Sequence, residues 1–146
     1  MLGELASTFG ADSAHFTVWN RSLGRAELAV TARDDPKSEG KYATAYGQID
    51  PCRKLLEGEP IGNWITNHER LGSEVLEQHP YYKEFLKPLG FLFVAKCRVN
   101  VSDDGNRCSI FGLARKRDAE PFETGRLAAI ARKLNPHLAR AAALHN

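Results

Sequence analysis

Aromatic side chains gather in the middle of this 146-residue sequence and could supply the chemistry of a small-molecule pocket. Tyrosine hydroxyls and a tryptophan indole combine apolar surface with a few hydrogen-bonding groups, which is how proteins orient ligands in apolar cavities. The alternative is an ordinary aromatic core whose polar groups reach backbone partners or water. The eight residues are Tyr42, Tyr46, Trp64, Tyr81, Tyr82, Phe85, Phe91 and Phe93.

Two further residues are candidates for this pocket. Asp50 could anchor a ligand through its carboxylate, or it could be a turn residue that ends a helix before Pro51. Cys97 is expected opposite Gly112, where a missing side chain could leave room for a ligand over a sheet. A glycine within a strand more often marks a bulge or the close approach of a helix.

Signatures of catalysis and of metal binding are missing. The five histidines are scattered, and no HExxH pair or phosphate-binding glycine loop occurs. Cys52 with a histidine could form a nucleophile–base pair, and Arg53 and Lys54 could lower its thiol pKa, but the surrounding sequence matches no catalytic signature. We therefore predict no enzyme activity, no catalytic residue, no metal and no cofactor.

Composition narrows the class of protein. With 42% hydrophobic and 26% charged residues, the chain is typical of one globular domain covering residues 1–146. A net charge of +2 predicts no direct contact with nucleic acid, and no apolar run is long enough to span a membrane. Three cysteines without metal-site spacing, and no secretory signal, predict reduced thiols and a cytoplasmic location.

Hydrophobic periodicity and turn signals predict an α+β fold, with helices packed on an antiparallel sheet. The predicted elements are a helix at Leu2–Phe9, strands at Ala14–Asn20 and Ala26–Ala32, a helix at Lys41–Ile49, a strand at Asn63–Thr66, short helices at Ser73–Gln78 and Tyr81–Lys87, a strand at Phe91–Val101 with its partner after the Asp103–Asn106 turn, and a long helix within Pro121–Asn146.

The Asp104-Gly105 pair suggests a tight hairpin between the last two strands. In that register Val101 faces Cys108, Val99 faces Ile110 and Cys97 faces Gly112, so these residues would share one apolar face.

The last helix is amphipathic, basic and rich in alanine. Its apolar residues at helical spacing include Leu127, Ile130, Leu134 and Leu138, and Pro136 should bend it because proline cannot donate the backbone hydrogen bond. We predict that this helix carries output from the domain and forms a contact in a homodimer.

Three stretches taken in order resemble one family. They are Lys41–Pro51, His79–Gly90 and Pro121–Ala141, and together they are similar to the N-terminal sensory region of LuxR-type helix-turn-helix transcriptional regulators. The resemblance implies a GAF/PAS-like fold and a DNA-binding helix-turn-helix domain that would follow residue 146 and is absent from this sequence.

Some members of that family bind acyl-homoserine lactones. For these the resemblance implies that Asp50 accepts a hydrogen bond from the ligand amide and that Trp64 bonds the lactone carbonyl, with Tyr46 nearby. The match is partial, because the further tryptophan expected on the Tyr42 helix is replaced by Ala43 and Ala45.

The sequence therefore predicts a ligand-sensing domain that passes a signal through its last helix to a DNA-binding domain. The ligand would be a small apolar or amphipathic molecule. Its predicted contacts are Tyr42, Tyr46, Asp50, Trp64, Tyr81, Phe85, Phe93 and Cys97. The competing hypothesis is a dimerisation or protein-interaction module with a filled core and no ligand.

Overall fold

A five-stranded antiparallel sheet, with strand order β2-β1-β5-β4-β3, forms the centre of the computed structural model, which describes residues 2–144. The strands are β1 (Ser13–Asn20), β2 (Arg25–Ala32), β3 (Trp64–Thr66), β4 (Phe91–Val101) and β5 (Arg107–Lys116). The predicted α+β class is confirmed.

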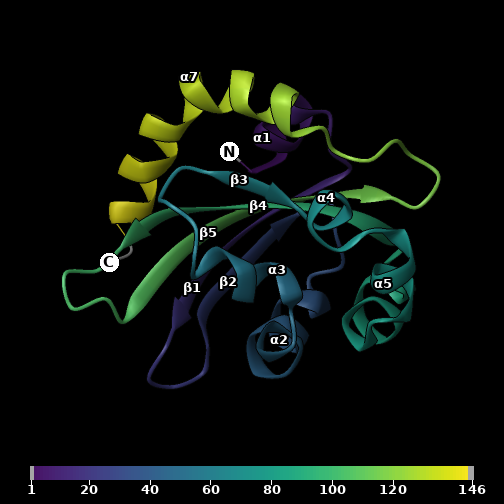
Figure 1. The fold of residues 1–146 in the computed structure, drawn as a ribbon. Coiled ribbons are helices and arrows are strands. Elements are labelled where there is room, and N and C mark those ends of the chain that lie inside the picture. Colours follow the sequence, from purple (N-terminus) through teal and green to yellow (C-terminus); the bar gives the residue numbers. More distant parts are fainter. Residues whose placement is uncertain (1, 145–146) are drawn as a thin grey trace.

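Helices cover both faces of this sheet. The helical elements are α1 (Leu2–Phe9), α2 (Lys37–Thr44), the 3-10 helix η1 (Tyr46–Gln48), α3 (Pro51–Leu56), α4 (Asn67–Leu71), α5 (Ser73–Gln78), the π-helical η2 (Tyr81–Leu86), α6 (Lys87–Leu89) and α7 (Thr124–Ala143). Figure 1 shows α1 and α7 on one face, with α2 and α3 on the other. We call these the α7 face and the α2 face.

The long periodic segments have the predicted secondary structure, whereas the segment around Asp50 differs from the prediction. The expected helix Lys41–Ile49 is α2, which begins earlier, followed by η1. Asp50 begins a helix instead of ending one: its backbone is extended and its carboxylate accepts a hydrogen bond from the Cys52 N–H, while Pro51 takes the first helical position. This combination of cap and proline starts α3, which the sequence analysis missed.

The predicted register of the β4–β5 hairpin is wrong beyond its turn. Val101 pairs with Cys108 as expected, but a bulge between Arg98 and Asn100 then shifts the pairing by one residue. Cys97 consequently opposes Phe111, and Gly112 opposes Lys96. Because neighbouring residues of a strand face opposite ways, the bulge puts Lys96 on the face that was assigned to Cys97.

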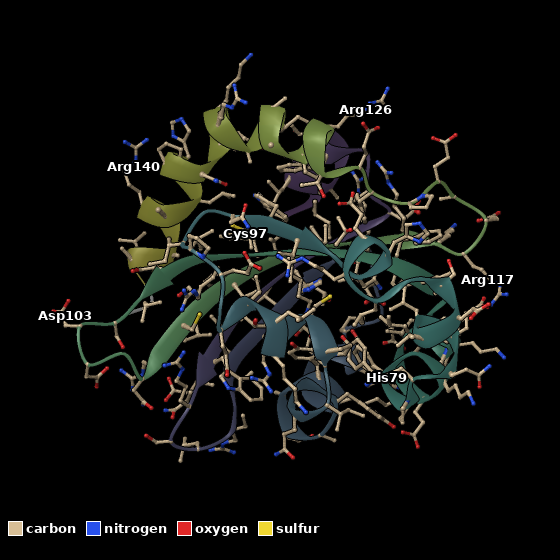
Figure 2. All side chains as sticks on the ribbon, viewed as in Figure 1. His79, Cys97, Asp103, Arg117, Arg126 and Arg140 are labelled. Carbon is tan, nitrogen blue, oxygen red and sulfur yellow. The ribbon has the colours of Figure 1, made fainter. Side chains whose placement is uncertain are left out.

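Helix α7 packs its apolar side on its own sheet. Leu127 and Leu138 are buried, and Ile130 and Leu134 are partly buried against the same core. Pro136 lies on the exposed side and the helix continues through it, curving over the sheet (Figure 1). The solvent side carries small and basic residues, and Figure 2 shows Arg126 and Arg140 pointing away from the domain. A dimer contact through α7 would therefore use this outer side.

One side chain ties the middle of α7 to the edge of the sheet. Asn135 accepts a hydrogen bond from the Trp64 indole Nε1 at 3.1 Å and donates to the Gly62 carbonyl at 2.8 Å. Trp64 is 3% exposed, so its N–H has little access to water if Asn135 is removed.

We expect the substitution Asn135→Ala to lower the free energy of unfolding by about 1–3 kcal/mol, because a buried donor loses its acceptor. Lys133→Ala, at an exposed position of the same helix, should change it by less than about 0.5 kcal/mol. Urea unfolding followed by circular dichroism measures both, and equal effects of the two substitutions would show that the Trp64–Asn135 contact does not secure α7.

Candidate functional site

A buried ion pair lies between the sheet and the helices of the α2 face. The Lys96 Nζ is 2.7 Å from Asp50 Oδ2, and both residues are fully buried. The Tyr42 hydroxyl donates to the same carboxylate oxygen at 2.7 Å and accepts from Lys96 Nζ at 3.2 Å. The ammonium also lies 4.6 Å from the centre of the Tyr42 ring. One cation, one anion and one phenol thus form a closed triangle, which we call the Lys96 cluster.

Three separate elements contribute to the Lys96 cluster. Lys96 comes from β4, which β3 and β5 flank on both sides, and Tyr42 comes from α2. Asp50 is held at the start of α3 because its other oxygen, Oδ1, accepts the Cys52 N–H at 3.0 Å. The cluster therefore fixes where α2 and α3 sit on the sheet.

Burial and the charge of Lys96 act in opposite directions on the pKa of Asp50. Burial, the largest effect, raises the pKa of Asp50, but the charge of Lys96 and the hydrogen bonds from Lys96 and Tyr42 outweigh it and hold this pKa below its usual value. Burial, reinforced by the Asp50 charge, raises the pKa of Tyr42 well above its usual range. The carboxyl group stays ionised and the phenol stays protonated, as the hydrogen bonds require.

A histidine occupies the space that a glycine leaves beside the cluster. His15 of β1 and Lys96 of β4 both pair with Gly112 of β5, so the three positions form one row across the sheet. A Cβ on Gly112 would lie 1.9 Å from His15 Nε2. Burial and the Lys96 charge lower the pKa of His15 to about 3, so the ring is neutral near pH 7. The interpretation favoured for Gly112, a bulge or the close approach of a helix, is wrong, because the ring of His15 from the neighbouring strand fills the space above it.

A cavity of about 40 Å³ opens beside this row, between the sheet, α2 and η2. This volume holds about three water molecules. Apolar and aromatic side chains form much of its wall, including Tyr42, Tyr81, Phe85 and Val94. Two of its lining residues carry a buried polar atom, His15 Nε2 and Thr17 Oγ1, that has no hydrogen-bond partner within the described part of the chain.

Five residues of the predicted site lie at this cavity or next to the residues that line it. Tyr42, Tyr81 and Phe85 line it, with ring centres 5.3–6.4 Å apart. Tyr46 packs on the outer side of Phe85, with ring centres 5.1 Å apart. Asp50 lies behind Tyr42 in the Lys96 cluster.

Three other residues of the predicted site lie away from it, on the α7 face. Trp64 pairs with Cys97, the Trp64 ring packs 5.1 Å from that of Phe9, and its indole N–H bonds Asn135. Phe93 stacks edge-on against His68 at 5.7 Å. The expectation that Trp64 and Cys97 share a space with Tyr42 is wrong, because the β4 bulge turns Lys96 towards the α2 face and Cys97 away from it.

The hydrogen bonds expected for a lactone ligand are made by the chain itself. Asp50 accepts three hydrogen bonds, from Lys96, Tyr42 and the Cys52 N–H, and Trp64 donates to Asn135. A second cavity beside Asp50 measures only about 10 Å³.

Sequence reasoning missed Lys96, His15 and Thr17. A detectable signal was the lysine in the middle of an eleven-residue strand that is otherwise mostly apolar, since lysine is rarely buried without a partner. His15 and Thr17 alternate with Phe16 and Val18, and the sequence did not indicate which set faces a cavity.

Nucleophilic and metal chemistry find no support here. Burial raises the pKa of Cys52 well above its usual value, that of Cys97 to about 12 and that of Cys108 to about 11, which keeps all three as thiols. The proposed lowering of the Cys52 pKa by Arg53 is therefore wrong; the Arg53 guanidinium stacks 3.9 Å above Trp19. Within residues 2–144, no three His, Cys, Asp or Glu side chains are grouped to hold a metal ion.

Removing only one charge of the ion pair should lower the free energy of unfolding more than removing both charges does. We expect Lys96→Met to lower the free energy of unfolding by about 3–5 kcal/mol, because it leaves the Asp50 charge buried without a partner. Lys96→Met combined with Asp50→Asn should cost less than the sum of the single substitutions.

Urea unfolding at pH 7 measures the free energy of unfolding of the two single variants and of the double variant, with Arg70→Met as control. Arg70 pairs with Glu59 at the surface, where loss of an ion pair costs less than about 1 kcal/mol. Additive effects at Lys96 and Asp50 would contradict an energetically coupled pair.

His15, which is partly buried and neutral in the folded protein, should make the protein less stable in mild acid. The unfolded chain binds a proton at His15 below about pH 6.5, whereas the folded chain does so only near pH 3, so stability is lost as the pH falls between these values. From pH 7 to pH 5 the loss from this residue should be about 2 kcal/mol.

The variant His15→Gln removes the titrating group and should lose correspondingly less stability over the same interval. Urea unfolding at both pH values measures the difference, with His68→Gln at a partly exposed position as control. An unchanged pH dependence in His15→Gln would rule out a buried neutral imidazole.

Comparison with known proteins identifies the fold. The sequence matches no family model and no curated protein. The solved structures that are similar to this chain include the three that follow. The VqsR ligand-binding domain of Pseudomonas aeruginosa has a TM-score of 0.70 at 16% identity, covering 95% of this chain and 79% of that one.

The second is CepR2 of Burkholderia cenocepacia, an N-acylhomoserine lactone-dependent LuxR family transcription factor, with a TM-score of 0.65 at 13% identity over 99% of this chain and 84% of that one. The third is a GAF domain/HD domain protein of Geobacter sulfurreducens, with a TM-score of 0.63 at 16% identity. The match covers 97% of this chain and 87% of that one. The chain thus has the GAF-like fold that the ligand-binding domains of LuxR-type regulators share with GAF domains.

Proposed function

We propose that this chain is the sensory domain of a LuxR-type transcriptional regulator and that a small molecule binds in the 40 Å³ cavity beside the Lys96 cluster. The observation that carries the proposal is that two residues lining this cavity each hold a buried polar atom, His15 Nε2 and Thr17 Oγ1, without a hydrogen-bond partner within residues 2–144. A ligand or ordered water is needed to satisfy them, since an unpaired buried polar group costs about 1–3 kcal/mol.

The fold supports a sensory role for this cavity. Two of the similar structures are described as a ligand-binding domain and as a lactone-dependent regulator. The present cavity differs in size and in chemistry from the site that the sequence resemblance implied, because Asp50 and Trp64 are already bonded to Lys96 and Asn135. We infer a ligand smaller than an acyl-homoserine lactone, and binding without catalysis.

A route for the signal runs through β3 to α7. Lys96 pairs with Ile65 in β3, the adjacent Trp64 bonds Asn135 in α7, and Gly62 at the start of this segment accepts from the same asparagine. A ligand that moves the Lys96 cluster would act on α7 along this path only if it binds two arrangements of the domain with different affinity. The outer side of α7 would then meet a second copy or a following DNA-binding domain.

A ligand-free dimerisation module is the second candidate. The small volume of the cavity favours it, since 40 Å³ leaves most of the interior filled by side chains. In that case the cavity holds water alone, and α7 contributes its outer face to a partner regardless of small molecules.

The substitution Thr17→Val separates the two functions. It keeps the shape of the side chain and removes the unpaired hydroxyl, so we expect the free energy of unfolding to rise by about 1 kcal/mol while binding of small polar molecules weakens. Thr44→Val, at an exposed position of α2, is the matched control.

Thermal shift and NMR chemical-shift mapping with a panel of small metabolites and lactones measure binding by the wild type and both variants. Ligand-induced shifts at Thr17 and its neighbours that are lost in Thr17→Val support the sensor. A panel with no binder would leave the ligand-free module as the better account.

A further inference from the structure

The charges around the cavity indicate which class of molecule it takes. Two acidic residues, Asp34 and Glu39, line it, and none of its lining residues is a lysine or arginine. Both carboxylates are only partly buried and, with the partly buried Leu89, they mark where the cavity meets solvent. The nearest buried cation, Lys96, is already neutralised by Asp50.

Neither acidic group has a positively charged partner within the described chain. Asp34 accepts from the Asp35 N–H at 2.7 Å and from Ser38 Oγ at 3.3 Å. Glu39 Oε1 accepts from the backbone N–H and the hydroxyl of Thr31, at 2.8 and 3.1 Å. The entrance therefore holds two negative charges in fixed positions with no salt bridge to offset them.

The inner end of the cavity offers hydrogen bonds without charge. Thr17 is 2% exposed, lines the cavity, and has a hydroxyl without a hydrogen-bond partner among residues 2–144. His15 also lines the cavity and has a neutral imidazole. A hydroxyl and an imidazole nitrogen can bond an alcohol group of a ligand, which both donates and accepts.

An aromatic wall joins the two ends. Tyr42, Tyr81 and Phe85 contact one another through their rings, and the Tyr42 ring already holds the Lys96 ammonium at 4.6 Å. Aromatic faces next to carboxylates attract organic cations. The volume of about 40 Å³ limits the ligand to a few non-hydrogen atoms unless side chains move.

We propose that the cavity binds a small protonated amine that carries a hydroxyl group, with its ammonium at Asp34 and Glu39 and its hydroxyl at Thr17 and His15. This inference rests on the proposed sensory function and names the chemical class of its ligand. Ethanolamine, an amino alcohol with four non-hydrogen atoms, matches the charge and the polarity of the residues that line the cavity.

The test compares four probes of similar size on the wild-type chain by NMR chemical-shift titration. Ethanolamine carries both groups, propylamine only the ammonium, ethylene glycol only hydroxyls, and glycolate a negative charge. We expect ethanolamine to shift the resonances of Thr17, Thr31 and Glu39 at the lowest concentration, propylamine to bind about tenfold more weakly, and glycolate not to bind there.

Variants at the entrance test the electrostatic part. Glu39→Gln keeps an oxygen for Thr31 and removes the charge, and it should weaken ethanolamine binding by about tenfold. Asp34→Asn is the second variant, so that the result does not depend on one substitution. Glu84→Gln, at an exposed position of η2 outside the cavity lining, is the matched control and should bind as the wild type does. Thermal unfolding verifies that each variant is folded.

The outcomes separate this inference from the proposed function. Tighter binding of ethanolamine that depends on Glu39 or Asp34 supports the amine class. Preferred binding of glycolate or ethylene glycol, or amine binding unaffected by both acidic substitutions, overturns it while leaving a sensory cavity. If none of these probes and nothing in the wider panel binds, the sensory function itself fails.

Discussion

The ion pair between Lys96 and Asp50 is the interaction on which the arrangement of the α2 face depends. A lysine in the central part of a sheet can be buried only if an anion meets it, and Asp50 does so at 2.7 Å with Tyr42 closing the triangle. Such a pair contributes little net stability because desolvation of both charges offsets their attraction. Its effect is on position, since α2, α3 and β4 must all be in place before either charge is satisfied.

The two faces of the sheet differ in their packing because of this arrangement. On the α2 face, a cavity lies beside the row of Lys96, Gly112 and His15, and two of its lining residues hold buried polar atoms without a partner within residues 2–144. On the α7 face, Phe16, Phe111 and Cys97 are buried in the hydrophobic core. The only described hydrogen bonds from the middle of α7 to the sheet edge pass through Asn135, which bonds Trp64 of β3 and the Gly62 carbonyl that precedes this strand.

The sequence predicted the fold better than the site, for identifiable reasons. Strands β1 and β2, helix α1 and helix α7 show clear periodicity, and each formed close to its predicted bounds. Helix α3 was missed because its start depends on the cap made by Asp50, which reads equally well as a helix end. Tyr42, Tyr81 and Phe85 were recognised as a group, but Trp64 and Cys97 were grouped with them through a register that one bulge at Arg98–Asn100 overturned.

By itself the sequence determined the class of fold, the amphipathic terminal helix and a set of aromatic residues rich enough to form a pocket wall. These follow from local patterns, in which each residue's neighbours three or four positions away already indicate its environment. Tertiary structure alone decided which residues meet there. The β4 bulge turned Lys96 inward, Asp50 reached it from 46 residues away, and His15 filled the space above Gly112. Contacts between distant segments depend on strand register, and a shift of one residue exchanges the two faces of a strand.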